Sequence, residues 1–228
     1  MRKFRYTTLE DCHTANGVVI LIDVLRAFST AAYAFSRGAK EIVLVSGVEE
    51  ALTLKTQIPN SKVMGEVGGL PPEGFDFGNS PTHISAEALS GITLIQRTGA
   101  GTQGAVRSQN ADLMLAASFV VADATIRFVK KLGVDEVTFV VTGKHAQRGD
   151  EDLACAEYLE GLLKGDCPDA KPFLQRVFDS IDAIQHLDLL ETAFPLSDLE
   201  YCTAIDRFNF AMPITREDGQ LIMRCAQP

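Results

Sequence analysis

Short apolar runs of strand length recur along the chain, and segments of helical character separate most of them. The first run, VVILIDV at 18–24, is followed by the alanine-rich stretch RAFSTAAYAFSRG. Because strands alternate with helices and the strands are almost continuously apolar, the pattern predicts an α/β fold whose sheet is buried on both faces. We therefore expect three α/β/α layers around a mostly parallel sheet. The further predicted strands cover 41–46, 61–67, 91–98, 112–118 and 136–142.

The residues after Gly165 follow a different pattern. Two helical stretches, KPFLQRVFDSIDAIQHL and PLSDLEYCTAIDRF, precede two apolar runs separated by Asp218-Gly219. A turn of this type predicts a β-hairpin, and we expect it at the sheet edge, where its antiparallel strands would make the sheet mixed. A length of 228 residues fits one large domain. We therefore expect a single domain over 1–228, with 165–228 as a helical and hairpin appendage.

Charge and cysteine content exclude several classes of protein. The net charge of −9 argues against broad binding to nucleic acid, which requires a basic face. No run approaches the roughly 18 apolar residues of a membrane span, and the N-terminus has no apolar leader. The five cysteines include no C-x-x-C pair, which indicates reduced thiols rather than a zinc or redox site. We expect a cytoplasmic protein that binds neither nucleic acid nor membrane.

Three glycines follow the predicted strand 91–98 in the spacing G-x-G-x-x-G: Gly99, Gly101 and Gly104. In dinucleotide-binding folds this motif follows the first strand, and an acidic residue ends the next strand. Here the next strand ends at Ser118, and Asp123 lies in or at the start of a helix. We interpret the glycines as a turn that contacts phosphate or substrate. A plain tight turn and a dinucleotide-binding oxidoreductase stay open as alternatives.

Ionisable side chains follow the predicted strands, at the sheet edge where open α/β proteins bind ligands. Crowded carboxylates repel one another unless a cation or protons intervene, and Mg²⁺ binds through one or two carboxylates plus substrate phosphate. Cations and helix N-termini favour an anion, so the set points to phosphoryl chemistry. Each residue also has a structural alternative, such as a helix N-cap or an ion pair. The candidates are Asp23, Glu66, Asp76, Glu151 and Asp152, the cations Arg26 and Arg97, and the loop residues Lys144, Arg148 and His145, the last as a candidate acid.

Five motifs occur in a defined order. They are D-V-L-R-A-F-S-T at 23–30, G-E-V at 65–67, G-F-D-F-G-N-S-P at 74–81, T-G-A-G-T at 98–102 and E-D-L at 151–153. In type and order they resemble the magnesium-dependent 2-phosphosulfolactate phosphatases, from residue 18 to about 165. Val67 stands where that family has an arginine. The motif at 98–102 is one residue longer than the family's T-N-G-T, with Gly99 or Ala100 in place of asparagine.

The resemblance implies a Mg²⁺-dependent phosphatase acting on a small anionic phosphate ester, 2-phosphosulfolactate, in coenzyme M biosynthesis or related sulfonate metabolism. A metal-bound water and Asp23 are both open as the attacking group. A non-catalytic anion-binding protein stays open as an alternative, and a homo-oligomer is compatible with the sequence. We expect catalytic roles for Asp23, Arg26, Glu66 and Asp76, substrate contacts from Ser29, Thr30, Asn79, Ser80, Arg97, Thr98, Gly101 and Thr102, and metal ligands among Asp23, Asp76, Glu151 and Asp152.

Overall fold

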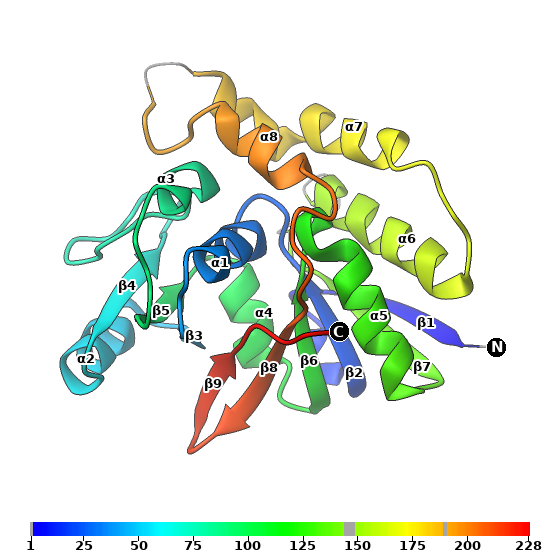
Figure 1. Ribbon diagram of the computed structural model, residues 1–228, viewed down its shortest axis with the longest axis horizontal. Helices are drawn as coiled ribbons and strands as arrows, with labels where there is room; N and C mark the ends of the chain where they lie inside the picture. Colours follow the sequence, from blue (N-terminus) through cyan, green and yellow to red (C-terminus); the bar gives the residue numbers. More distant parts are fainter. Residues whose placement is uncertain (1, 144–148, 189–190) are drawn as a thin grey trace.

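A computed structural model describes residues 2–143, 149–188 and 191–228. These residues form a nine-stranded sheet in the order β1-β7-β2-β6-β8-β9-β3-β5-β4 (Figure 1). The strands are β1 (Lys3–Thr8), β2 (Gly17–Ile22), β3 (Glu41–Leu44), β4 (Ser61–Gly65), β5 (Thr93–Arg97), β6 (Ala111–Ala117), β7 (Glu136–Val141), β8 (Met212–Glu217) and β9 (Gln220–Met223).

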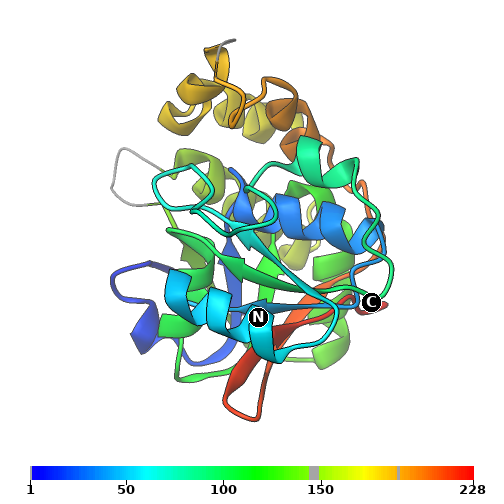
Figure 2. The same cartoon turned by 90° about the vertical axis from the view of Figure 1, so that its left-hand side faces the viewer.

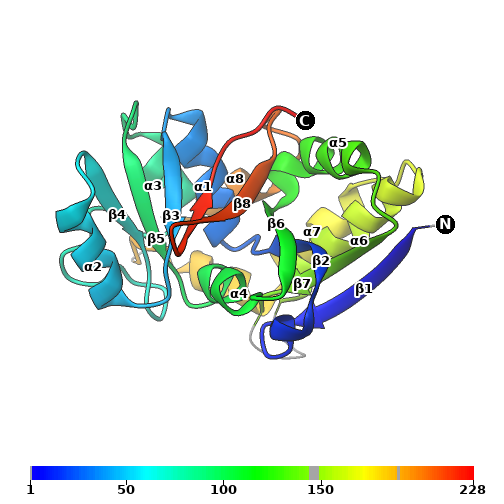
Figure 3. The same ribbon diagram turned by 90° about the horizontal axis from the view of Figure 1, so that it is seen from below.

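The C-terminal hairpin lies in the middle of the sheet, between two sets of parallel strands. β1, β7, β2 and β6 form one set, and β3, β5 and β4 form the other. β8 pairs antiparallel with β6, and β9 pairs antiparallel with β3, as Figure 3 shows from below. The expected mixed α/β fold is confirmed, but the expected place of the hairpin at the edge is wrong. Leu221, Ile222 and Met223 are all buried, so β9 is covered on both faces, as a central strand requires.

Helices cover both faces of the sheet and give the expected three layers. α1 and α4 pack with Leu21 and Met64 in one core cluster, which also contains residues of β8 and β9. α5 and α6 cover the other face of β2, β6 and β7, and α2 covers the other face of β3, β5 and β4. The helices are α1 (Ala27–Ser36), α2 (Val48–Gln57), α3 (Pro81–Ser85), α4 (Gly101–Arg107), α5 (Ala122–Leu132), α6 (Asp150–Lys164), α7 (Lys171–Asp179) and α8 (Ser197–Thr203), with 3-10 turns η1 (Cys12–Thr14), η2 (Phe119–Val121) and η3 (Ile181–Leu187).

β1 is a strand that the sequence pattern did not predict. Its sequence KFRYTT lacks an apolar run, because it is an edge strand that pairs with β7 alone and leaves much of its surface exposed. Charged residues suit an edge, since they oppose pairing with a second chain.

The segment with α7, η3 and α8 lies at one end of the molecule, beyond the sheet (Figures 1 and 2). The long helical stretch predicted at 171–187 is divided at Ser180, whose hydroxyl accepts a hydrogen bond from the Ala183 amide and begins η3. Within the described ranges, no helix has the length and apolar character needed to cross a membrane.

Candidate active site

Carboxyl ends from both strand sets meet at a cavity of about 200 Å³. Asp23 follows β2, Thr142 follows β7, Glu66 follows β4, and Gly99 lies two residues after β5. The two sets run in formally opposite directions, because three antiparallel pairings separate them. A twist of about 20–25° per strand pair adds up to roughly 100–125° between β2 and β5, so the strands cross and both sets can end at one cavity. The described lining residues are Asp23, Leu25, Arg26, Glu66, Gly68, Gly69, Asn79, Gly99, Ala100, Thr142, Gly143, Glu151, Asp152, Asp182, Gln185 and Phe194.

Asp23 joins the starts of two helices at this cavity. Its Oδ1 accepts a hydrogen bond of 2.9 Å from the Ala27 amide at the start of α1, and the Gly101 amide of α4 also donates to the carboxylate. A Cβ on Gly101 would lie 2.8 Å from Asp23 Oδ2, so the close approach requires glycine. In a dinucleotide-binding fold a pyrophosphate occupies the helix start. Here the Asp23 carboxylate takes that place, which argues against the oxidoreductase alternative.

Glu66 connects the loop after β4 to the glycine turn after β5. Its Oε2 accepts from the Gly69 amide at 2.7 Å, and its Oε1 accepts from the Gly99 amide. The carboxylate therefore fixes the shape of two cavity walls, in addition to contributing negative charge.

Glu151 and Asp152 enter the cavity from the first turn of α6. Asp152 Oδ1 accepts from the Val24 amide at 2.7 Å and Oδ2 accepts from the Thr142 hydroxyl at 3.3 Å, so this carboxylate holds the chain just after β2. Glu151 differs, because its buried Oε2 has no hydrogen-bond partner among the described residues. A buried oxygen of this kind requires a proton, water or a cation.

Burial and mutual repulsion raise the pKa values of three cavity acids. Burial raises the pKa of Asp23 to about 6, against the hydrogen bond from Ala27, and the charges of Glu66 and Asp182 add to the increase. Burial raises the pKa of Glu151 to about 7, with further contributions from Asp182 and Asp23. The pKa of Asp152 lies well above its usual range, chiefly through burial and then through Glu151. The cavity therefore disfavours full ionisation of its own carboxylates.

These carboxylates fit a hard cation better than they fit an anion. The described lining has five acidic residues and one cation, Arg26. No three histidine, cysteine, aspartate or glutamate residues in the described part of the chain form a ready-made metal cluster. Mg²⁺ does not require one, since it keeps several waters and uses one or two carboxylates plus substrate oxygens. The unpartnered Glu151 Oε2 and the raised pKa values are what a site for such a cation is expected to have.

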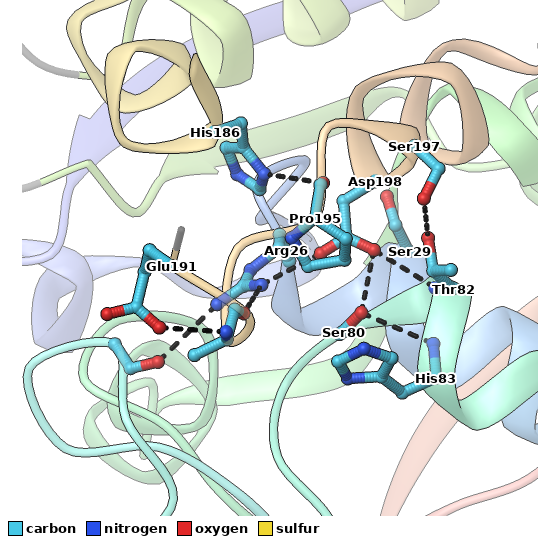
Figure 4. A network of polar contacts seen from close by, with 12 residues as sticks. Arg26, Ser29, Ser80, Thr82, His83, His186, Glu191, Pro195, Ser197 and Asp198 are labelled. Carbon is cyan, nitrogen blue, oxygen red and sulfur yellow. Dashed lines mark hydrogen bonds and ion pairs between the residues drawn. The ribbon is translucent and has the colours of Figure 1, made fainter. Parts of the chain in front are cut away.

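Arg26 reaches the cavity but is also held in a buried network (Figure 4). Its Nη1 donates to Asp198 Oδ2 at 2.8 Å and to the Ala193 carbonyl at 2.6 Å, and its guanidinium lies 4.4 Å from the centre of the Phe194 ring. The Arg26 charge is thus balanced by Asp198 inside the protein. It therefore does not compensate the carboxylates of Asp23, Glu66, Glu151 and Asp152.

Several predicted site residues lie outside the cavity lining. Asp76 is bound on the far side of β4, where its Oδ2 accepts from the Val63 amide and pairs with Lys55 Nζ, both at 2.8 Å. The structure therefore does not bring Asp76 together with Asp23 and Glu151, and we do not retain it as a metal ligand.

The predicted substrate contacts divide in the same way, and only Asn79 lines the cavity. Ser29 and Thr30 are buried in α1, and Ser29 donates to the Val24 carbonyl. Arg97 donates to the carbonyls of Ser46 and Glu66. The remaining expected contacts have internal partners: Ser80 bonds Asp198, Thr98 and Thr102 cap each other across the start of α4, and Gly101 bonds Asp23.

Four residues of the C-terminal region that lie at or beside the cavity were not predicted: Asp182, Gln185 and Phe194 line it, and Asp198 holds Arg26. They belong to the C-terminal helical region, whose sequence pattern predicts helices but gives no sign of a site. The expected loop residues Lys144, His145 and Arg148 lie outside the described residues.

Comparison with known proteins agrees with this geometry. A family model described as 2-phosphosulpholactate phosphatase matches residues 5–217. A relative from Bacillus subtilis (strain 168) is 36% identical over 203 residues, covering 89% of this chain and 88% of the relative. A relative from Deinococcus radiodurans is 35% identical over 165 residues (70% and 68%), and one from Thermotoga petrophila is 31% identical over 207 residues (87% of each). All three are named "Probable 2-phosphosulfolactate phosphatase". The chain therefore belongs to the 2-phosphosulfolactate phosphatase family, a family of phosphoric monoester hydrolases.

Proposed function

We propose that this protein is a Mg²⁺-dependent phosphatase that hydrolyses the phosphate ester of a small 2-hydroxy acid, with 2-phosphosulfolactate as the first candidate. The charge of the cavity carries the proposal. The carboxylates of Asp23, Glu66, Glu151 and Asp152 line a cavity whose one described cation, Arg26, is already paired with Asp198. A polyanionic substrate cannot bind there until cations offset the carboxylates.

The carboxylates of Asp23, Glu151 and Asp152 are the groups that would hold Mg²⁺, with Glu66 beside them. They come from the end of β2, the first turn of α6 and the end of β4, around one cavity. When bound, the ion would neutralise phosphoryl oxygens and make attack at phosphorus easier. Both oxygens of Asp152 and Glu66 already accept hydrogen bonds, so Glu151 Oε2 is the best-placed donor atom.

Protein groups other than the carboxylates would orient the substrate. The guanidinium of Arg26 retains N–H groups on Nε and Nη2, and Asn79 contributes a side-chain amide to the same wall. Asp23 is held by Ala27 and Gly101, which supports either role for its carboxylate: orienting an attacking water or attacking phosphorus itself.

The departure at Val67 is compatible with this activity. Val67 is 49% exposed and is not among the described cavity-lining residues. The replacement of the family's arginine by valine therefore leaves the described lining, including Arg26, unaltered. We propose that substrates with a smaller second anionic group than that of phosphosulfolactate are accepted as well. Val67 lacks the hydrogen-bond donors that an arginine at this position would add for such a group.

Phosphate release from a panel of small phosphate esters, with and without Mg²⁺, tests the proposal. The panel includes 2-phosphosulfolactate and a carboxylate analogue, and EDTA should stop turnover. If none of the esters releases phosphate at any of several Mg²⁺ concentrations, the proposal is overturned. Phosphate binding without turnover would indicate the anion-binding alternative. The cytoplasmic location, the homo-oligomer and the place in coenzyme M biosynthesis stay predictions.

A further inference from the structure

Asp198 is a fully buried carboxylate, 0% exposed, at the start of α8. It lies outside the described cavity lining but contacts two segments that reach it (Figure 4). Its Oδ2 accepts from Arg26 Nη1 at 2.8 Å, while its Oδ1 accepts from the Ser80 hydroxyl at 2.7 Å and the Thr82 amide at 3.0 Å. Each oxygen thus serves a different part of the chain.

The first oxygen determines how Arg26 is turned. Nη1 gives its two N–H groups to Asp198 and to the Ala193 carbonyl. Among the described residues, Nη2 has one acceptor, the Gly69 carbonyl oxygen at 3.5 Å, which is a long contact. Nε and Nη2 are therefore the atoms with donors left for a ligand. Arginine has a rigid fork of donors, so fixing one nitrogen fixes the direction of the others.

The second oxygen fixes the chain around Asn79. Ser80 is the N-cap of α3, and its hydroxyl both donates to Asp198 and accepts from the His83 amide at 3.3 Å. Asn79 precedes it, is 6% exposed and lines the cavity, and its Oδ1 has no hydrogen-bond partner among the described residues. A buried, unpartnered amide oxygen of this kind requires a hydrogen-bond donor from a ligand or water.

We propose that Asp198 is a positioning residue for the phosphatase reaction, holding Arg26 through one oxygen and Asn79, by way of Ser80, through the other. This inference rests on the proposed function. It also explains why Ser80 lies away from the cavity lining: its hydroxyl serves Asp198 rather than the substrate. A merely structural tie between α3 and α8 would stabilise the fold without affecting substrate binding.

Steady-state kinetics of Asp198→Asn distinguish these two roles. The variant keeps the shape of the side chain but removes its charge and one acceptor. We expect KM for the phosphate ester to rise about tenfold or more, with a smaller change in kcat, because Arg26 and Asn79 contact the bound substrate. The matched control is Asp206→Asn, since Asp206 lies in the same region and accepts from the Asp123 amide outside the cavity lining. Its KM should stay at the wild-type value.

A double-mutant cycle tests whether Asp198 acts through Arg26. In an Arg26→Ala background, Asp198→Asn should lower kcat/KM by a smaller factor than it does in the wild type, because only its effect through Ser80 and Asn79 remains. Full additivity of the two substitutions would overturn the positioning role. Should Asp198→Asn fail to fold, Ser80→Ala takes its place: its KM should rise about threefold or more, and Ser80→Thr, which keeps the hydroxyl, should restore it.

Wild-type KM and kcat in a folded Asp198→Asn, or in Ser80→Ala, would overturn the inference while leaving the proposed function intact. Calorimetry with inorganic phosphate and Mg²⁺ measures the same contacts without turnover. An inactive wild type that still binds phosphate, with binding about tenfold weaker in Asp198→Asn, would refute the phosphatase and show that Asp198 positions Arg26 and Asn79 for anion binding instead. A wild type that neither turns over esters nor binds phosphate would overturn both.

Discussion

Asp23→Asn separates the two effects of the buried Asp23 carboxylate. Asparagine keeps an oxygen that can accept from the Ala27 amide, so the start of α1 keeps its hydrogen bond. It removes the negative charge that lies beside Glu66 and inside the protein. We expect the variant to lose phosphatase activity, because the charge is needed at the reacting phosphoryl group, and to gain stability in the absence of Mg²⁺.

The size of the gain follows from the pKa. Burial, followed by the charge of Glu66, raises the pKa of Asp23 from 3.8 to about 6. At 1.36 kcal/mol for each pKa unit, ionised Asp23 lowers the free energy of unfolding by roughly 3 kcal/mol. A raised carboxyl pKa means that this cost is absent below about pH 4, grows as the pH rises to about 6, and is constant above. Asparagine has one acceptor oxygen, so the hydrogen bond from the Gly101 amide is lost, which offsets about 1 kcal/mol and leaves a net gain of about 2 kcal/mol, or roughly 4–8 °C in Tm.

Thermal and urea unfolding at pH 4 and pH 8, without metal, measure this difference. The Asp23→Asn variant should be more stable to unfolding than the wild type at pH 8 but not at pH 4. Added Mg²⁺ should stabilise the wild type more than the variant. Asp76→Asn is the matched control with the opposite sign: it weakens the pair with Lys55 and should lose about 1 kcal/mol of stability while keeping turnover. A variant less stable than the wild type at pH 8 would show that the Asp23 charge stabilises the helix starts more than its burial costs.

The remaining predictions concern the ion, the glycine turn and the hairpin. Mg²⁺ binding should weaken below about pH 7, because burial raises the pKa of Glu151 to about 7 and its proton must leave first. Calorimetry in two buffers of different ionisation heat should detect the protons released, and Glu151→Gln should reduce their number. Gly101→Ala should cut turnover about tenfold or more, because its Cβ would lie 2.8 Å from Asp23 Oδ2, whereas Gly47→Ala, with 3.6 Å to Glu50 Cβ, should not. Deletion of 211–228 should prevent folding, as judged by near-UV circular dichroism, because β6 and β3 each lose one of their two partners and the sheet is divided.

Alternating apolar runs predicted the class of fold because burial on both faces leaves few polar positions in a strand. The hairpin was assigned to the wrong place because its turn chemistry is local and says nothing about which strands flank it. The three consecutive apolar residues Leu221-Ile222-Met223 were a local sign of a central position, and all three are buried in the structure. β1 lacked an apolar run because an edge strand does not need one; its apolar side chains are the alternating Phe4 and Tyr6.

The site was predicted where residues immediately follow strands. Asp23, Glu66, Glu151 and Asp152 do gather, since a strand end or the helix start after a strand places each of them. Asp76, Ser29 and Thr98 did not reach the cavity lining, because the direction of a side chain and its internal partners are not visible in a motif. Asp198 was missed for a related reason: a carboxylate that caps and pairs looks, in sequence, like any acidic residue of a helix.

The central position of β8 and β9 has a consequence for biosynthesis. During translation the two parallel strand sets leave the ribosome well before residues 212–223 do, yet those residues are the only described link between β6 and β3 in the sheet. Each set must therefore keep an open hydrogen-bonding edge until residues 212–223 have been made, a period when pairing with another molecule is a hazard. Slow steps late in synthesis, or a chaperone that shields these edges, should matter more for this protein than for one whose sheet grows outward in chain order.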